Sequence, residues 1–229
     1  MQNTRNRIVI ALCATDATML NITVPPLGRL REKFMLVIHN PNPDVPISRR
    51  DIRRMGYRGR LKIINSKTHA SLCQARRDMV AATGPRDAWI IFVDAGDVLT
   101  DIDTTPARAD NFAIIKNTLY VRRFSDLMHA AFNDRIPATD AVNVIAGQPG
   151  NILRGMPIRA DVMRRAAGGG LAMMEMGNPA SDAAAVDKMI WQEIRKSVGD
   201  NAKQSAIFME TVSYIVNDID GDAAAAPRG

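Results

Sequence analysis

The length, composition and charge of the chain exclude several classes of protein. The chain has 229 residues, of which 46% are hydrophobic and 24% charged, as in an ordinary globular protein with a buried core. No apolar run approaches the roughly 20 residues that a membrane helix needs, the first residues lack a signal-peptide core, and two cysteines, Cys13 and Cys73, do not make a disulfide scaffold. We therefore expect a soluble, cytoplasmic protein with free thiols, and its net charge of +6 favours anionic partners.

Four short apolar runs in the first half of the chain predict β-strands. They cover residues 8–14, 34–38, 61–64 and 89–93, and segments with helical patterns separate them. Strands that alternate with helices need crossover connections, which produce a mainly parallel sheet with helices on both faces. The sequence therefore predicts an α/β fold at least as far as residue 100.

A helix is predicted to begin after the second of these strands, at Ser48. This serine is placed as an N-cap, with Asp51 three residues later as its partner in a capping box. The apolar residues Ile47 and Ile52 flank the cap at the spacing of a hydrophobic staple. Local sequence alone therefore fixes where this helix starts.

The helical segments after the first and third strands differ in regularity. Residues 71–83 carry apolar side chains on one face and end at Gly84-Pro85, a strong stop signal. In contrast, residues 18–33 include Pro25-Pro26, which remove two backbone donors. We expect the helix in residues 18–33 to break in two at these prolines.

The pattern is looser beyond residue 100. Ser181 is placed to cap a helix with an apolar face, whereas residues 206–216 fit a helix and a strand equally well. Residues 218–229 are rich in Asp and Ala and are expected to be disordered. The remaining predicted segments are strands at 111–120 and 141–146, and a strand, a turn and a short helix across 151–165.

Two aspartates follow the fourth apolar run, in the sequence D-A-G-D. Asp94 and Asp97 are close enough to repel each other unless a cation or a cationic side chain lies between them. In an open parallel sheet, ligands bind beyond the carboxyl ends of the strands, where Thr15 and His39-Asn40 are also expected. Carboxylate oxygens suit Mg²⁺ or Mn²⁺ that bridges to substrate phosphates. The structural alternative is that Asp97 caps a turn and Asp94 pairs with a nearby arginine.

Arg76 and Arg77 lie in the helix predicted after the third strand. Neighbouring residues on a helix do not share a face, so only one of them can point to the crevice and neutralise a diphosphate; the alternative is that both face solvent. The chain has no G-x-x-x-x-G-K-[ST], no G-x-G-x-x-G after the first strand, no H-E-x-x-H and no C-x-x-C. These absences argue against kinase-type ATP binding, a Rossmann dinucleotide site and structural zinc.

The motifs follow one another in a defined order. A polar pair ends the second strand, an A-R-x helix (residues 75–77) follows the third, and I-I-F-V-D-A-G-D-V-L comes next. The segment N-I-L-R-G-M-P-I-R-A-D-V-M-R-R-A-A-G-G-G and a Ser181-Asp182 pair that opens a helix complete the order. Over roughly residues 8–197 this order resembles the family 2 glycosyltransferases of the GT-A fold. The resemblance implies a GT-A-like, Rossmann-related single domain over residues 1–217, with a nucleotide-binding half to about residue 100 and an acceptor half from about 101.

The resemblance also implies an activity and a set of site residues. The activity is transfer of a sugar, with inversion, from a nucleotide-diphosphate sugar such as a UDP-sugar to an acceptor. The cofactor is Mg²⁺ or Mn²⁺. By position, the resemblance assigns Thr15 to the nucleotide, Asn40 to the base, Arg76 to the diphosphate, Asp94 to the ribose, Asp97 to the metal and Asp182 to the general base, with Asp187 as the fallback for that last role.

Three positions depart from the family pattern. Gly96 replaces the middle acidic residue of the F-L-D-x-D-D motif, His39 replaces the first residue of a D-D pair, and Ser181 replaces the glutamate of E-D. One or two metal ligands are therefore missing. We expect a cation that is bound weakly or shared with the donor diphosphate.

Two other functions stay open at the level of the sequence. One is a sugar-phosphate nucleotidylyltransferase, although the G-G-x-G-T-R-L expected after Ile8 is absent. The other is a catalytically degenerate module that binds a nucleotide or a polyanion. The basic stretch over residues 49–62 is either a solvated helix face or a docking site for an anionic acceptor, such as a glycan, a lipid-linked carrier or a modified nucleic acid.

Overall fold

Four parallel strands form one half of the sheet, and their carboxyl ends lie at the same edge. They are β1 (Arg7–Cys13), β2 (Phe34–Asn40), β3 (Arg60–Asn65) and β4 (Asp87–Asp94), in the order β3-β2-β1-β4. Cys13 is in register with His39 on one side and with Asp94 on the other, so the polar strand ends are brought level. All four predicted strands are confirmed. The computed structural model describes residues 7–105, 111–121, 154–168, 183–198 and 205–217.

The other four strands extend the sheet beyond β4 with mixed directions. They are β5 (Val98–Leu99), β6 (Asn111–Val121), β7 (Ile158–Arg159) and β8 (Ser205–Asn217), and the complete order is β3-β2-β1-β4-β7-β6-β8-β5. β7 is antiparallel to β4 and β6, β8 is parallel to β6, and β5 is antiparallel to β8. The strand predicted at 111–120 is confirmed, and the ambiguous residues 206–216 are a strand. The strand predicted at 141–146 and the tail 218–229 lie outside the described residues.

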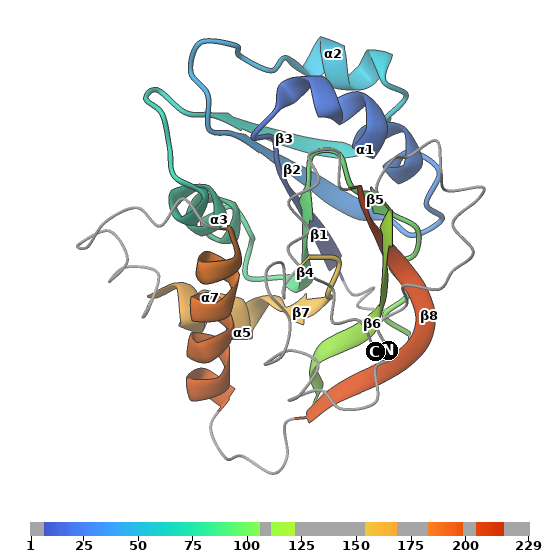
Figure 1. Ribbon diagram of the computed structural model, residues 1–229, viewed down its shortest axis with the longest axis vertical. Helices are drawn as coiled ribbons and strands as arrows, with labels where there is room; N and C mark the ends of the chain where they lie inside the picture. The colour runs from blue at the N-terminus through green and yellow to red at the C-terminus, as the bar shows by residue number, and fades with distance from the viewer. Residues whose placement is uncertain (1–6, 106–110, 122–153, 169–182, 199–204, 218–229) are drawn as a thin grey trace.

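Helices cover both faces of this sheet, as Figure 1 shows. The short 3₁₀ helix η1 (Ala17–Met19), α1 (Leu20–Leu27) and α2 (Arg49–Arg54) lie on one face; α3 (Leu72–Ala81), α5 (Ala160–Gly168) and α7 (Ala183–Val198) lie on the other. Alternate residues of β1 therefore enter two separate apolar cores: Ile10 packs toward α1, and Ala11 packs toward α3. Burial on both faces explains why the strands are continuous apolar runs.

The predicted helix starts are found at α2 and α3. The Ser48 hydroxyl accepts a hydrogen bond from the Asp51 N–H, and the Asp51 carboxylate accepts one from the Ser48 N–H, which completes the capping box. The Ser71 hydroxyl caps α3 by accepting from the Gln74 N–H. No helix among the described segments is long and apolar enough to cross a membrane.

The prediction that residues 18–33 form a helix broken in two at the prolines is wrong. A single α-helix, α1, contains both Pro25 and Pro26 in its last turn and ends one residue later, at Leu27. The prolines sacrifice only two intrahelical bonds there, and the Gly28 N–H still donates to the Val24 carbonyl at 3.1 Å. Because Leu20, Val24 and Leu27 are buried against the sheet, packing maintains the helix despite the missing donors.

Candidate functional site

The carboxyl ends of the central strands bring the predicted site residues that the structure describes to one edge of the sheet. Backbone hydrogen bonds hold the ends together, from the Ala14 N–H to the His39 carbonyl at 2.9 Å and from the Ala95 N–H to the Cys13 carbonyl at 3.0 Å. Thr15, the residue after Ala14, is exposed at this edge. Polar residues at or just after the ends of β1, β2 and β4 therefore lie along this edge.

The D-A-G-D segment is a tight turn that positions two carboxylates. Gly96 has a φ of +104°, a conformation that L residues with a side chain rarely adopt. The Asp97 N–H donates to the Asp94 carbonyl at 3.1 Å, and the Gly96 N–H donates to the Thr23 hydroxyl of α1 at 2.9 Å. The glycine that replaces the family's acidic residue is thus required by the backbone of this turn.

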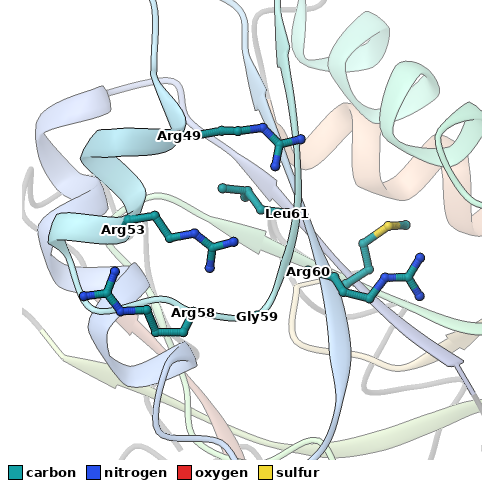
Figure 2. A pocket seen from close by; sticks show the side chains of 7 residues that line it. Arg49, Arg53, Arg58, Gly59, Arg60 and Leu61 are labelled. Carbon is teal, nitrogen blue, oxygen red and sulfur yellow. The ribbon is translucent and has the colours of Figure 1, made fainter.

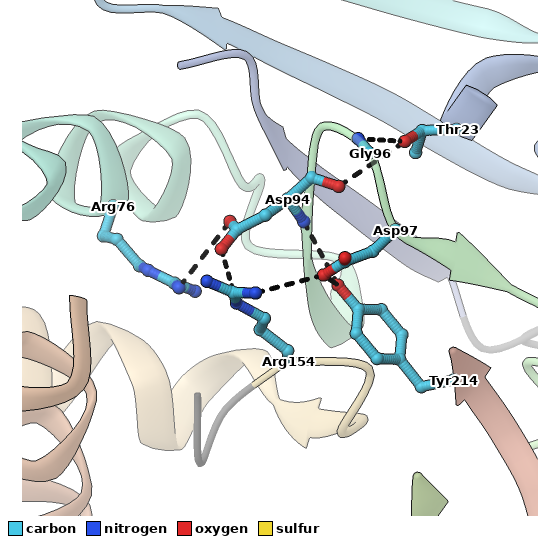
Figure 3. A network of polar contacts seen from close by, with 7 residues as sticks. All are labelled: Thr23, Arg76, Asp94, Gly96, Asp97, Arg154 and Tyr214. Atoms are coloured by element: carbon cyan, nitrogen blue, oxygen red, sulfur yellow. Dashed lines mark hydrogen bonds and ion pairs between the residues drawn. The ribbon is translucent and has the colours of Figure 1, made fainter. Parts of the chain in front are cut away.

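One arginine, Arg154, bridges the two aspartates (Figure 3). Its Nε lies 2.5 Å from Asp94 Oδ2, and its Nη1 lies 3.2 Å from Asp97 Oδ2. The side chains are 16% exposed for Arg154, 13% for Asp94 and 4% for Asp97, so solvent screens the pairs only weakly. The repulsion between the carboxylates is therefore relieved by a guanidinium group.

Tyr214 of β8 forms the other side of this network. Its hydroxyl donates to Asp97 Oδ2 at 2.7 Å and accepts from the Asp94 N–H at 3.2 Å, as Figure 3 shows. Burial, followed by the nearby charges of Asp97 and Asp94, raises the pKa of Tyr214 well above its ordinary value. The phenol therefore stays protonated and remains a hydrogen-bond donor at every physiological pH.

Gly155 holds Arg154 in place. The Gly155 N–H donates to the Phe92 carbonyl of β4 at 2.8 Å, and Arg154 itself forms an isolated parallel bridge with Phe92. Gly155 has a φ of +70°, and a Cβ at this position would lie 2.5 Å from Cβ of Tyr214 and closer still to Cγ and Cδ2. The backbone next to Arg154 is therefore wedged between β4 and the Tyr214 ring.

Of the two neighbouring arginines in α3, only Arg76 faces the site. Its side chain is fully buried, with Nη2 3.8 Å from Asp94 Oδ1 and Cζ 4.5 Å from the centre of the Phe92 ring. Arg77 instead donates to the side chain of Gln74 on the same helix. Arg76 is thus a buried counter-ion of Asp94. This pair agrees with the alternative prediction that Asp94 pairs with a nearby arginine.

Cys13 lies beside the same carboxylate, at the end of β1. Burial, and then the charge of Asp94, raise the pKa of the Cys13 thiol to about 12. Cys73 is also buried and is not part of a disulfide bond. The raised pKa of Cys13 is the opposite of the lowered pKa that a nucleophilic thiol needs.

Asn40 and His39 are occupied by contacts within the fold. The Asn40 amide nitrogen donates to the Val45 carbonyl at 2.8 Å and to Asn65 Oδ1 at 3.0 Å, and its Oδ1 accepts from the Asn42 N–H at 3.1 Å. His39 Nε2 is 3.1 Å from Asp78 Oδ2 on α3. In this structure, Asn40 fixes the loop after β2, and His39 links β2 to α3.

The residues present do not fit the expected Mg²⁺ or Mn²⁺. Both carboxylates that would coordinate the cation are paired with Arg154, and Gly96 supplies no third one. Within the described part of the chain, no group of three or more His, Cys, Asp or Glu side chains is placed to hold a metal ion. We therefore derive no step that uses a metal at Asp97.

The structure also reveals what the sequence did not identify. Arg154, Tyr214 and Thr23 complete the network: Arg154 lies in the N-I-L-R-G segment, to which the sequence assigned no role, and Tyr214 and Thr23 lie in segments without a recognisable motif. The predicted general base Asp182 lies outside the described residues, and its fallback Asp187 is on α7. The roles of Asp182 and Asp187 therefore stay predictions.

A second charged feature lies at the opposite end of the parallel strands. A pocket of about 530 Å³ is lined by Arg49 and Arg53 of α2, by Arg58 and by Arg60 at the start of β3 (Figure 2). Other lining residues are Met35, Gly59 and Leu61. Arg60 and Met35 are in register at the amino ends of β3 and β2, five residues before Asn65 and Asn40. At about 3.3 Å per residue, the pocket is roughly 17 Å along the strands from the carboxyl edge.

The chain resembles solved glycosyltransferases in fold. No protein-family model and no curated protein sequence matches it. S. aureus TarS residues 1–349 superpose with a TM-score of 0.61 at 11% identity over 93% of this chain and 60% of that one, and TarS has also been solved with UDP and with UDP-GlcNAc. The mannosyltransferase PcManGT from Pyrobaculum calidifontis, in complex with GDP-Man and Mn²⁺, gives a TM-score of 0.55 at 14% identity over 92% of this chain and 56% of that one. This chain thus spans little more than half of these proteins, and its fold is that of the GT-A glycosyltransferases.

Proposed function

We propose that this protein is a glycosyltransferase that transfers a hexose from a nucleotide-diphosphate sugar to an acceptor. The observation that carries the proposal is the Arg76–Asp94–Arg154–Asp97 cluster, located at the carboxyl ends of the central strands of a GT-A fold. This edge is where open α/β sheets bind ligands. The likeness to proteins solved with UDP-GlcNAc and GDP-Man supports a nucleotide-sugar donor, and a UDP-sugar is our first choice.

The donor would lie across the strand ends. Thr15, exposed after β1, is available to the nucleotide, and we assign Asp94 the role of accepting from a ribose hydroxyl. We assign Asn40 the role of shaping the base pocket through the loop it holds, since its amide already bonds within that loop. The arginines would face the negative charge of the diphosphate. Residues 1–217 would act as one domain, with the donor bound by its first half and the acceptor by its second.

The chemistry proposed is a single displacement with inversion. An acceptor oxygen bonds to the anomeric carbon as the bond from that carbon to the diphosphate oxygen breaks, and the electron pair leaves on the nucleoside diphosphate. The Asp182 carboxylate takes the acceptor proton, a contribution of about 10² to 10⁴ in rate. Arginine side chains stabilise the charge that develops on the leaving phosphate.

Release of the nucleoside diphosphate from a panel of UDP- and GDP-sugars tests this proposal. We expect one donor to be hydrolysed slowly without an acceptor, and Asp182→Asn to abolish transfer while the Kd of the donor changes less than about threefold. Asp187→Asn, at the fallback position on α7, is the matched control and should retain activity. Loss of donor binding in Asp182→Asn would reassign that residue, and a lack of binding or hydrolysis of every donor would refute the enzyme.

We further propose that the acceptor is an anionic polymer that docks at the arginine pocket. Ten of the Lys and Arg residues, against three Asp and Glu, lie within residues 29–62, so this segment accounts for the whole net positive charge of +6. The pocket is too far from the strand ends for one small molecule to fill both sites. A chain of repeating negative charges would span the distance and be bound in a salt-dependent manner.

Substitution of the pocket tests the acceptor proposal. Arg53→Glu combined with Arg54→Glu should raise the KM for an anionic acceptor and leave the Kd of the donor unchanged; Arg165→Glu, on the exposed face of α5, is the control. Unchanged acceptor kinetics would mean that the basic stretch over residues 49–62 is a solvated helix face with no role in acceptor binding. If the protein is instead a polyanion-binding module, salt-sensitive binding would persist in Asp97→Ala without any transfer.

A further inference from the structure

Two carboxylates three residues apart at the end of a buried strand need a positive charge between them, and here a side chain provides it. The two contacts of Arg154, at 2.5 Å to Asp94 and 3.2 Å to Asp97, use the Oδ2 atom of each aspartate. Oδ2 of Asp97 also accepts from the Tyr214 hydroxyl at 2.7 Å. The site is therefore neutralised and hydrogen-bonded before any ligand arrives.

The charges balance within this cluster. Arg76 and Arg154 together carry two positive charges, equal to one divalent cation, and they face the two negative charges of Asp94 and Asp97. A guanidinium group is weakly hydrated and fits a site where the carboxylates are 13% and 4% exposed. In contrast, Mg²⁺ gives up its water reluctantly and needs several oxygen ligands around it.

The backbone conformations of two glycines produce this arrangement. Gly96, with φ +104°, removes a carboxylate from the turn, whereas Gly155, with φ +70°, allows Arg154 to approach β4 beneath the Tyr214 ring. A glycine at position 96 leaves the turn with one carboxylate fewer to bind a metal, and a glycine at position 155 brings a cationic side chain to the same place. Neither glycine alone would leave the site neutral.

From this geometry we infer that Arg154 replaces the divalent cation, so that the donor diphosphate binds to this protein without metal. The inference rests on the proposed function, because it names the residue that faces the diphosphate at that same site. Arg154 is 16% exposed, whereas Arg76 is fully buried, so Arg154 is the one of the two that a ligand can reach. Its planar group has five N–H donors, which permits contacts to phosphate oxygens in addition to the carboxylates.

Nucleotide binding with and without metal tests the inference. UDP and GDP are titrated calorimetrically into the full chain in EDTA and in Mn²⁺, with wild type, Arg154→Gln and the control Arg165→Gln. We expect the wild-type and control Kd values to agree within about twofold in both buffers, and Arg154→Gln to bind at least tenfold more weakly in EDTA. Addition of Mn²⁺ should recover part of that loss in Arg154→Gln alone, because Asp94 and Asp97 have then lost the guanidinium group that bridges them.

A second measurement uses Mn²⁺ alone and requires no nucleotide. The electron paramagnetic resonance signal of free Mn²⁺ should be unchanged by wild type and should fall with Arg154→Gln. A Kd for Mn²⁺ below about 100 µM in wild type, or nucleotide binding by wild type that depends on metal, would overturn the inference. So would an unchanged nucleotide Kd in Arg154→Gln.

The two measurements also separate this inference from the proposed function. If no nucleotide binds in either buffer, the glycosyltransferase proposal fails and Arg154 has no donor role, yet the Mn²⁺ signal still shows whether Arg154 blocks a cation. Should Arg154→Gln not fold, Arg154→Lys keeps the charge and is expected to keep metal-free binding with a several-fold loss. Metal dependence in Arg154→Lys but not in wild type would mean that the bridging shape of the guanidinium is essential.

Discussion

A methyl group added at Gly155 tests whether the backbone beside Arg154 is wedged under the Tyr214 ring. In Gly155→Ala the residue keeps a φ of +70°, which costs an L residue about 1–2 kcal/mol. The new Cβ would also overlap Cγ and Cδ2 of Tyr214, and overpacking of this kind costs about 1–3 kcal/mol more. The expected loss in the free energy of unfolding is therefore about 2–5 kcal/mol, a large part of the total stability of a domain.

Gly56→Ala is the matched control for this substitution. Gly56 has a φ of +95°, but a Cβ there would meet no atom within 4 Å, so only the backbone cost applies. Urea unfolding followed by circular dichroism measures both variants, and the difference between them, about 1–3 kcal/mol, belongs to the contact with Tyr214. In a Tyr214→Ala background the alanine at 155 should cost less than in wild type, since Cγ and Cδ2 are gone. Equal losses for Gly155→Ala and Gly56→Ala would refute the wedge.

Two other predictions concern neighbours of the same network. Tyr214→Phe removes the donor to Asp97 from a buried site, so it should lower the free energy of unfolding by about 1.5–3 kcal/mol in urea, while a loss below 0.5 kcal/mol would mean that water replaces the hydroxyl. The Cys13 thiol keeps its proton up to a pKa of about 12 in the folded chain but only up to its ordinary pKa of 9.0 in the unfolded chain. The contribution of the protonated thiol to the free energy of unfolding is thus complete below pH 9 and declines by about 1.4 kcal/mol per pH unit between pH 9 and 12. Cys13→Ala should remove this slope from the plot of unfolding free energy against pH, and parallel plots for the variant and wild type would contradict the raised pKa.

Most of the parallel half of the fold was predictable because its signals are local. Strands buried on both faces must be apolar at every position, so β1 and β4 are visible as uninterrupted runs. The capping box at Ser48 is likewise a pair of short-range hydrogen bonds that the local sequence predicts. The segment 206–216 was ambiguous because the partner that makes it a strand, β6, lies far away in the chain.

The cluster around the aspartates was predictable only in part, for the same reason. Asp94, Asp97 and Arg76 stand in motifs that suggest a role for each. Arg154 lies in the N-I-L-R-G segment, which suggests none, and it is 57 residues from Asp97, while Tyr214 is 117 residues from Asp97. No periodicity or spacing relates positions so far apart. The one local trace is Gly155, whose positive φ allows the close approach, and a glycine alone does not reveal what it approaches.

The sequence nevertheless defined the physical problem that the site solves. Two like charges at the end of a buried strand can be stabilised by a metal ion or by an arginine, and both solutions were open from the sequence. The choice between them depends on whether a third carboxylate is available and whether a guanidinium group reaches the turn. Gly96 shows, within the motif, that no third carboxylate is available at that position. Only the packing of Gly155 beneath Tyr214 shows that a guanidinium group reaches the turn. A GT-A chain that lacks the middle acidic residue of this motif should therefore be searched for an arginine-glycine pair on the strand bridge beside its fourth strand before a metal is assumed.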